Sequence, residues 1–313
     1  MLNRRQLIQT AALSALPLAP VWAQTFPSKP LKIIVPFGAG GVADLTARAV
    51  AQKLSESLGQ PVVIDNRPSA GGIVAGELVA KAEPDGYTLL LMSNGTAVSA
   101  GLFKSLPFNP RSDFAPVSLL GLFDMAVVVP ENSPFKTLSE LIAFGHANPG
   151  KLNIGTINIG STQHLAAELL RSQANWVAQV IPYNGTPAVI NALRGGQVDA
   201  AVEILGPMKP QINAKAVRLL GVMGENRPKD LPQTPTVREL PGLSNFNVSS
   251  WNALAAPAKT PKSVIDKLNA EVVRVFRLPD IQERLKTLGL DPVLSTPEEL
   301  ARYQAVEITK WAK

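Results

Sequence analysis

The chain has 313 residues, of which 46% are hydrophobic, so it can form two domains with buried cores and is too apolar to be disordered as a whole. It contains no cysteine and only two histidines, which excludes disulfides, thiolate chemistry and a histidine-rich metal site. The formal net charge of +6 is spread along the sequence and suits small anions better than nucleic acid.

Residues 1–23 have the pattern of an export signal peptide. Arg4 and Arg5 give a positively charged start, an apolar stretch runs from Leu7 to Leu18, and Val21-Trp22-Ala23 offers a cleavage site with small residues. The apolar stretch falls short of the roughly 20 residues that a membrane-crossing helix needs, and no later stretch is long enough. We therefore expect a periplasmic mature protein.

A strand, a glycine turn and a helix open the mature chain. The run from Leu31 to Val35 is rich in β-branched residues and predicts a buried strand, which Pro36 ends. From Val42 to Leu58 apolar residues recur at helical spacing. The first N–H groups of such a helix lack intrahelical partners, so together with the helix dipole they attract anions. We expect a carboxylate to bind at the turn formed by Phe37, Gly38, Gly40 and Gly41.

The next elements continue an α/β alternation. Strands are predicted at 61–65 and 87–92, with a helix from Ile73 to about Lys81 between them. Open parallel sheets bind ligands at the carboxyl ends of their strands. The polar stretch from Ser93 to Thr96 follows the third strand as a turn, so we expect Ser93 and Asn94 to lie on the same rim as the first glycine turn.

A second alternation begins after a long apolar strand from Leu122 to Val129. It contains predicted strands at 152–156, 177–181, 198–203 and 217–223 and helices at 138–147, 164–173 and from Thr186 to about 194. The strand, glycine turn and helix recur there, with Gly160 in the turn and Ser161 or Thr162 as the cap. A strand at 248–257 then precedes helices at 261–276, 279–288 and 297–311.

The order of these elements predicts two α/β domains with a ligand cleft between them. The chain would cross between the domains twice, near Leu122 and near Val248, and two crossings make a hinge. We expect a signal peptide at 1–23, a first domain made of 24–123 and the return segment 248–313, and a second domain at 124–247. The two glycine-bordered helix starts would then face each other and hold an anion between them.

Several further side chains are candidates for ligand contacts, and most have an equally ordinary structural interpretation. Asp44 can complement the dipole of its own helix instead. His164 can be a simple helix-surface residue, and Glu203 meets either a ligand amine or hydroxyl or a structural hydrogen-bond donor. The remaining candidates are Thr156, which ends a predicted strand of the second domain, and Tyr183 and Asn184, which follow the next one.

A dinucleotide site is the main rival interpretation of the first turn. Gly38 to Ala43 fits G-x-G-x-x-G/A, and Asp65 ends the next strand near the place of a ribose-binding acid. Pro36 in the turn and the export signal disfavour it, since nicotinamide cofactors are not freely supplied outside the cytoplasm. A secreted enzyme is a further alternative, but no nucleophile has an evident base. We expect no cofactor, no metal and no catalytic residue.

Short segments spread over nearly the whole mature chain carry a specific family resemblance. They are Phe26-Pro27-Ser28-Lys29-Pro30, Val35-Pro36-Phe37 with Gly40-Gly41, Asp65-Asn66-Arg67-Pro68, Pro84-Asp85-Gly86-Tyr87, Asn148-Pro149-Gly150-Lys151-Leu152-Asn153, Gly160-Ser161-Thr162, Pro182-Tyr183, Gly195-Gly196-Gln197-Val198, Leu231-Pro232 and Lys267-Leu268-Asn269. In these segments the chain resembles the Bug receptors, the substrate-binding proteins of tripartite tricarboxylate transporters.

The resemblance implies a type II periplasmic-binding-protein fold that closes on a small carboxylated ligand. In the family, the loops matching Pro36 to Gly41 and Gly160 to Thr162 hold a carboxylate, partly through ordered waters. The loops matching Ser93-Asn94 and Tyr183-Asn184 line the rest of the cleft. The chain departs from the family pattern at Gly38-Ala39, where prolines are common, and at Glu203-Ile204, where Asp and Asn are frequent. The identity of the ligand therefore does not carry over.

The resemblance also implies partners. The carboxylate would be delivered to membrane permease subunits of a tripartite tricarboxylate transporter, and we expect a monomer that binds no nucleic acid. A ligand-sensing periplasmic subunit of a membrane signalling partner would need the same site, so it stays open as an alternative.

Overall fold

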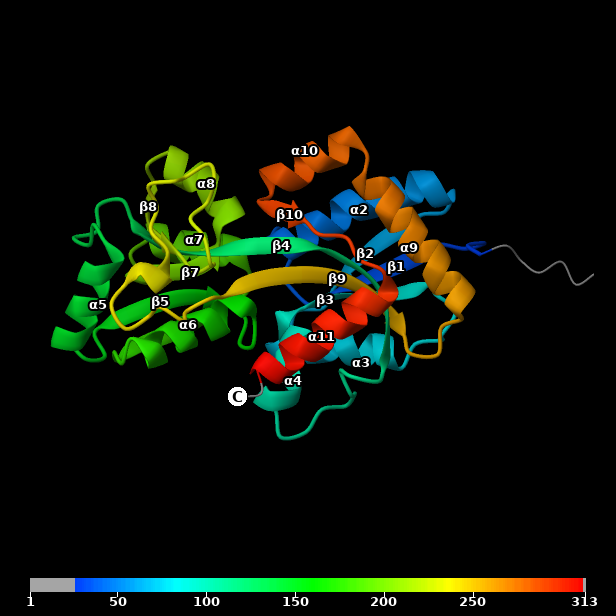
Figure 1. The fold of residues 1–313 in the computed structure, drawn as a ribbon, viewed down its shortest axis with the longest axis horizontal. Helices are drawn as coiled ribbons and strands as arrows, with labels where there is room; N and C mark the ends of the chain where they lie inside the picture. Colours follow the sequence, from blue (N-terminus) through cyan, green and yellow to red (C-terminus); the bar gives the residue numbers. More distant parts are fainter. Residues whose placement is uncertain (1–25, 312–313) are drawn as a thin grey trace, which may run out of the picture.

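The structure is a computed structural model that describes residues 26–311. It is elongated, with two lobes side by side along its long axis (Figure 1). The predicted signal peptide, residues 1–23, lies outside the described residues. Between residues 26 and 311, no helix combines the length and the apolar character that crossing a membrane requires.

Helices and strands alternate along most of the described chain. The strands are β1 (Leu31–Val35), β2 (Val62–Asn66), β3 (Thr88–Ser93), β4 (Phe114–Pro130), β5 (Leu152–Ile157), β6 (Ala178–Tyr183), β7 (Ala200–Ile204), β8 (Val217–Val222), β9 (Ser249–Pro257) and β10 (Leu290–Pro292). The helices are α2 (Val42–Leu58), α3 (Ile73–Ala80), α4 (Asn94–Leu102), α5 (Leu138–Ala147), α6 (Thr162–Gln173), α7 (Thr186–Arg194), α8 (Leu205–Asn213), α9 (Lys262–Phe276), α10 (Pro279–Thr287) and α11 (Pro297–Trp311).

The first lobe is a sheet of β2, β1, β3 and β9, covered by helices on both faces. β1 pairs in parallel with β2 and β3, and β9 is antiparallel to β3. Successive side chains of a strand point to opposite faces. Accordingly Ile33 packs in the core with residues of α2 and α9, whereas Ile34 packs with residues of α3, α4 and α11. The returning helices therefore complete the core of the first lobe.

The second lobe repeats this arrangement. β5 pairs in parallel with β6 and β7, and β4 is antiparallel to β7 and β8. The order β6-β5-β7-β4 thus matches the order β2-β1-β3-β9 of the first lobe. As a consequence α6, which follows β5, is the counterpart of α2, which follows β1.

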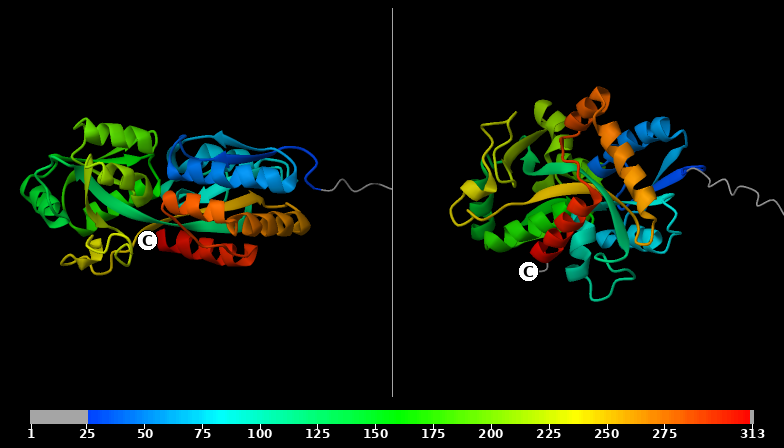
Figure 2. Two further views of the ribbon diagram at one scale, coloured as in Figure 1. Left: turned by 90° about the horizontal axis from the view of Figure 1, so that it is seen from above. Right: turned by 45° about the vertical axis from the view of Figure 1, so that its right-hand side comes forward.

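Two long strands connect the lobes. β4 pairs with β9 from Phe114 to Asp124 and then with β7 and β8 from Met125 onward, so one strand belongs to both sheets. Figures 1 and 2 show β4 and β9 running side by side between the lobes. This pair of strands places the carboxyl ends of the two parallel sheets opposite each other.

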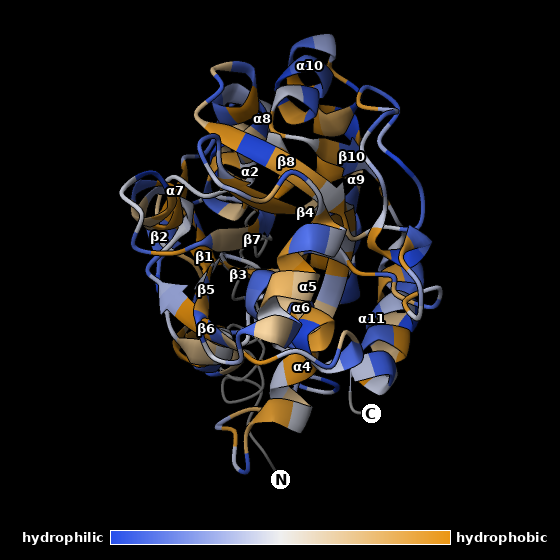
Figure 3. Cartoon of the chain, turned by 90° about the vertical axis from the view of Figure 1, so that its left-hand side faces the viewer, coloured by the Kyte–Doolittle hydropathy of each residue, from blue (hydrophilic) through white to orange (hydrophobic). Residues whose placement is uncertain are grey.

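The colouring in Figure 3 separates the layers. The central strands are mainly hydrophobic, whereas outer helices such as α10 and α11 carry both hydrophobic and hydrophilic residues. In α11, Leu300 and Ile308 are buried and Val306 is exposed. This pattern is typical of helices that cover a sheet with one face.

Two helices differ from the sequence prediction. The predicted turn at Ser93–Thr96 is wrong, because these residues start α4. Ser93 is its N-cap: its hydroxyl accepts a hydrogen bond from the Gly95 N–H at 3.2 Å, and its own N–H donates to Thr96 Oγ1 at 3.5 Å. The second helix, α8, has no counterpart in the prediction. It contains Pro207 in its first turn and Pro210 in its interior, and proline is unusual at the second of these places.

Candidate functional site

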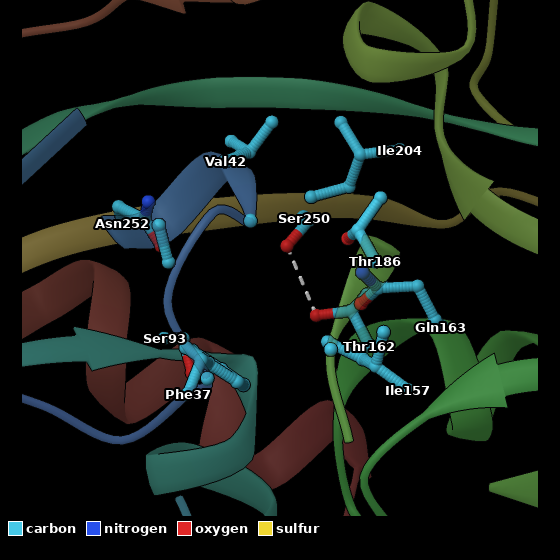
Figure 4. A pocket seen from close by; sticks show the side chains of 14 residues that line it. Phe37, Val42, Ser93, Ile157, Thr162, Gln163, Thr186, Ile204, Ser250 and Asn252 are labelled. Carbon is cyan, nitrogen blue, oxygen red and sulfur yellow. Dashed lines mark hydrogen bonds between the residues drawn. The ribbon is translucent and has the colours of Figure 1, made fainter. Parts of the chain in front are cut away.

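A pocket lies between the two lobes, with β9 along one side (Figure 4). Its lining residues come from both lobes and from β9: Phe37, Gly38, Gly41, Val42, Ala43, Ser93, Ile157, Thr162, Gln163, Gly185, Thr186, Ile204, Ser250 and Asn252. The lining combines apolar side chains with hydroxyl and amide groups. None of these residues is charged.

Five helices of the described chain begin at this pocket. Its lining includes the N-cap residues of α2, α4, α7 and α8, which are Gly41, Ser93, Gly185 and Ile204, and the first residue of α6, Thr162. The first N–H groups of a helix lack intrahelical partners, and the helix dipole makes this end positive. The pocket is therefore favourable for an anion although no basic side chain lines it.

The lobes touch each other around the pocket. The hydroxyl groups of Thr162 and Ser250 are hydrogen-bonded at 3.0 Å, and the Gly71 N–H donates to the Ile159 carbonyl at 2.8 Å. The cavity has a volume of about 20 Å³. That is little more than one water molecule needs. A ligand of several atoms therefore does not fit the pocket as it stands in this structure.

Asp44 shapes the first glycine turn from inside. Its carboxylate accepts hydrogen bonds from the Gly40 N–H at 2.9 Å, from Asn66 Nδ2 at 2.9 Å and from Arg48 Nε at 3.0 Å. Burial opposes the ionisation of Asp44, but these bonds outweigh it and lower its pKa. Gly40 and Asp44 were expected to contact the ligand. Neither lines the pocket, and the Gly40 N–H is bound by the Asp44 carboxylate.

Residues of the second glycine turn line two different cavities. Ser161 caps α6 by accepting a hydrogen bond from the His164 N–H at 3.1 Å, and with Gly160 it lines a smaller neighbouring cavity. Thr162 lines the main pocket. His164 lies outside both pockets, and burial lowers the pKa of its imidazole. Of these predicted residues, Thr162 alone reaches the main pocket.

Other predicted residues are engaged in the fold. The Asn94 amide donates to the Ser249 carbonyl and to Glu307, each at 3.3 Å, and accepts from the Trp251 N–H at 3.1 Å. The Thr156 hydroxyl donates to the Ile157 carbonyl at 3.1 Å. Neither Asn94 nor Thr156 lines the pocket. Their role as ligand donors stays a prediction.

Tyr183 and Asn184 also lie outside the lining of the pocket. Asn184 faces the first turn across the cleft, since a Cβ added to Gly38 would lie 3.3 Å from the Asn184 carbonyl oxygen. The chain after β6 therefore contributes to closing the cleft, and the pocket residues on this side are Gly185 and Thr186.

Glu203 lies directly behind the lining. It is fully buried, and its Oε2 accepts hydrogen bonds from Gln163 Nε2 at 3.2 Å and from the Ile204 N–H at 3.0 Å. Its Oε1 has no hydrogen-bond partner among the described residues. Burial raises the pKa of Glu203 to about 7, against the lowering effect of Gln163, Ile204 and Thr186. This carboxyl group therefore holds its proton far more readily than an exposed one.

The sequence prediction missed several lining residues, most notably Ser250 and Asn252 on β9. Their side chains face the pocket, whereas Trp251 between them is fully buried and packs edge-to-face on Tyr303. The alternation of small polar residues with a large aromatic one in Ser250-Trp251-Asn252 is a period-two signal for a strand with one polar face. It could have indicated these residues, but not the cleft that they face.

The structure disfavours a dinucleotide at the first turn. A Cβ on Gly40 would lie 3.3 Å from Pro187, so the second lobe covers the turn where a pyrophosphate would bind. Asp65 forms an ion pair with Arg67 at 2.8 Å. Among residues 26–311 there is also no group of three or more His, Cys, Asp or Glu side chains arranged to hold a metal ion.

Comparison with known proteins connects this architecture to a family. The family described as tripartite tricarboxylate transporter family receptor, TctC, matches residues 46–313. A protein of Pseudomonas sp. (strain P51), named as the UPF0065 protein in the tcbD-tcbE intergenic region, is 38% identical over 315 residues, covering 100% of this chain and 94% of its own.

Solved structures show the same fold. The periplasmic binding protein BugD has a TM-score of 0.87 and 32% identity, covering 92% of this chain and 96% of its own. MatC of Rhodopseudomonas palustris, with bound malate, has a TM-score of 0.85 and 32% identity, covering 92% of this chain and 99% of its own. These likenesses confirm the predicted two-domain periplasmic-binding-protein fold. Together with the match over residues 46–313, they show that the chain belongs to the tripartite tricarboxylate transporter family of receptors.

Proposed function

We propose that the protein is an exported receptor that binds a small organic carboxylate between its lobes and delivers it to the membrane permease of a tripartite tricarboxylate-type transporter. Membership of the receptor family supports the transport role, and the malate bound to MatC supports a carboxylate. The signal-like pattern in residues 1–23 and the relationship to a periplasmic binding protein support a periplasmic location.

The observation that carries this proposal is the convergence of five helix starts on a pocket with no charged lining residue. Each helix start contributes roughly 0.3–1 kcal/mol to the binding of an anion, and up to ~2 kcal/mol when partly buried. Micromolar affinity corresponds to about 8 kcal/mol. Five helix starts and a few hydrogen bonds from hydroxyl and amide groups reach this value, so a carboxylate needs no arginine or lysine here.

Closure of the lobes would complete the site. The segments 24–123 and 248–313 would move as one domain and 124–247 as the other. The chain would bend at β4 near Asp124, where this strand passes from one sheet to the other, and near Ser249, where β9 begins. Contacts across the cleft such as Thr162 with Ser250 would then form around the ligand. The proposed binding residues are Phe37, Gly38, Gly41, Ser93, Thr162, Gln163, Thr186, Ser250 and Asn252.

Isothermal titration calorimetry with a panel of mono-, di- and tricarboxylates, amino acids and neutral analogues of the same carbon skeletons tests this function. At least one carboxylate is expected to bind at micromolar concentration, and its amide analogue is expected to bind far more weakly. Failure of every carboxylate to bind a correctly folded protein would contradict the proposal.

A matched pair of variants locates the binding. Thr162→Val removes a hydroxyl from the pocket, whereas Thr309→Val removes one from the exposed face of α11, where it donates only to the Ala305 carbonyl. Only the first change is expected to weaken binding of the carboxylate. Equal effects of the two changes would show that the carboxylate binds outside the cleft.

A further inference from the structure

The two ends of the pocket differ in the hydrogen-bonding groups that they offer. Figure 4 shows Asn252 and Gln163 on opposite sides of the cavity. Asn252 Nδ2 is buried without a hydrogen-bond partner, so this side holds a free donor. On the other side the Gln163 amide is oriented by Glu203, because Gln163 Nε2 donates to Glu203 Oε2 at 3.2 Å.

This orientation makes the Gln163 side an acceptor side. A glutamine amide has one oxygen acceptor and one NH₂ donor group. Since the NH₂ group of Gln163 is bound to Glu203, its oxygen is left to accept a hydrogen bond, and no residue between 26 and 311 donates to it. Glu203 lies directly behind the lining and holds the Gln163 amide in this orientation. The Gln163 oxygen is therefore an acceptor on this side of the pocket.

No positive charge compensates the Gln163 oxygen. No cation lines the pocket, and Glu203 forms no ion pair in the described structure. A ligand carboxylate placed against the Gln163 oxygen would lose its hydration and meet an acceptor instead of a donor, which is costly in a closed pocket. A hydroxyl or ammonium group in the same place would donate to an oxygen that is otherwise without a partner.

We propose that Glu203 and Gln163 select the ligand: the receptor takes a carboxylate whose other end carries a hydrogen-bond donor, a hydroxyl or ammonium group, in preference to a dicarboxylate. This proposal rests on the proposed function, because it assigns the second end of the ligand whose carboxylate the helix starts hold. Gln163 would contact the ligand, and Glu203 would act as a positioning residue by fixing the Gln163 amide.

Matched ligands of one carbon skeleton test the preference. Calorimetry would compare butyrate, 4-hydroxybutyrate, 4-aminobutyrate and succinate, with the corresponding three- and five-carbon series to allow for chain length. At the length that binds best, a hydroxy or amino compound is expected to bind at least about tenfold more tightly than the dicarboxylate, which is the usual effect of leaving buried polar groups unpaired. Equal or tighter binding of the dicarboxylate would overturn the proposal.

Variants assign the preference to these two residues. Glu203→Gln and Gln163→Met are expected to reduce the ratio of affinities between the donor-bearing compound and the dicarboxylate to within about threefold. Glu168→Gln is the control. It also replaces a glutamate by glutamine, but at a residue of α6 that forms an ion pair with Arg171, so it is expected to leave the ratio unchanged. Circular dichroism would verify that each variant is folded. An unchanged ratio in both pocket variants would overturn the proposal.

The outcomes distinguish a failure of the proposed selectivity from a failure of the proposed function. If carboxylates bind but the ratio does not depend on Glu203 or Gln163, this selectivity is wrong and the receptor function stands. If no carboxylate of any series binds the folded protein, the proposed function itself fails.

Discussion

Glu203 is the residue whose surroundings depart most from those of an ordinary carboxyl group. Its hydrogen-bond partners, Gln163 and the Ile204 N–H, are neutral, and so is the nearby Thr186 hydroxyl. Burial raises its pKa to about 7, above the ordinary value of 4.5. A group with a raised folded-state pKa favours folding below its unfolded-state pKa, and this contribution is lost as the pH rises through the folded-state value.

Glu203→Gln should therefore change stability in a pH-dependent way. Glutamine cannot ionise, so the variant avoids the cost of a buried charge above pH 7. We expect the melting temperature of the variant to exceed that of the wild type by a few degrees at pH 8 and to be close to it at pH 5. Melting curves followed by circular dichroism without ligand measure this difference. The same difference at both pH values would show that the pKa of Glu203 is not raised in the folded protein.

Gly41 is the residue at which a side chain should block the pocket. Its φ of −82° suits any residue, and a Cβ there would lie 3.6 Å from Thr186 Oγ1 across the cleft. Gly41→Val places two methyl groups between the lobes without straining the backbone. We expect ligand affinity to fall at least about a hundredfold while the melting temperature without ligand changes little, with Gly41→Ala showing a smaller loss. Binding by the valine variant at wild-type affinity would show that the ligand does not bind at this turn.

Single residues of the pocket were predictable where they belong to a helix start and unpredictable elsewhere. Gly41, Ser93 and Thr162 follow strands in the sequence, so the rule that ligands bind at the carboxyl ends of strands indicates them. Ser250 and Asn252 lie inside a strand that only tertiary structure brings to the cleft. The sequence also gives no sign that the Asn94 side chain is hydrogen-bonded to Trp251 and Glu307, because these partners lie more than 150 residues away along the chain.

At the scale of elements, α6 separates a structural role from a binding role in two adjacent residues. Ser161 caps the helix through the His164 N–H, whereas the Thr162 hydroxyl contacts Ser250 across the cleft. Ser161→Ala should cost about 0.5–2 kcal/mol of stability and leave the affinity for the carboxylate within about threefold. Thr162→Val should weaken the carboxylate about tenfold or more and change the stability less. Chemical denaturation and calorimetry measure the two effects, and a reversal of the pattern would contradict this assignment.

Strongly patterned elements were predictable from the sequence. The boundaries of β1, α5 and α11 agree with the prediction, because hydrophobic periodicity, caps and prolines all indicate the same limits. α4 and α8 were not predicted. α4 begins with Asn94-Gly95-Thr96, which favours turns, and α8 contains two prolines. Both helices are held by tertiary contacts, α4 mainly against α11 and α8 against β4 and β8, which outweigh weak local preference.

For the whole molecule, closure of the lobes also depends on a contact outside the pocket. Gly206 at the start of α8 packs against the backbone of Leu288 and Gly289, which belong to the first lobe. A Cβ on Gly206 would lie 2.0 Å from the Leu288 carbonyl oxygen. The absence of a side chain at this position is therefore required for the lobes to meet as they do in this structure.

Gly206→Ala should hold the lobes apart. Alanine is a good helix residue, so α8 should still form, but the contact with Leu288 cannot. We expect an affinity loss of about tenfold or more, and the radius of gyration measured by small-angle X-ray scattering should no longer fall on addition of ligand. Gly195→Ala is the control, since its Cβ would meet only backbone atoms of its own helix. A wild-type response to ligand in the Gly206 variant would show that closure does not need this contact.

The arrangement of the lobes was predictable only in outline. Two series of strands and helices joined by apolar strands near Leu122 and Val248 indicated two domains and two crossings. The sequence could not show that β4 extends through both sheets or that α8 packs on the chain at Leu288, because both depend on how the lobes sit against each other.

A crystal structure of the protein with the carboxylate that binds most tightly in calorimetry tests most directly whether helix starts hold the ligand. We expect a closed protein with the carboxylate oxygens against the N–H groups at the starts of α2, α6 and α7, between Gly41, Thr162 and Thr186. A carboxylate bound outside the cleft, or held by lysine or arginine side chains instead of helix starts, would contradict this expectation.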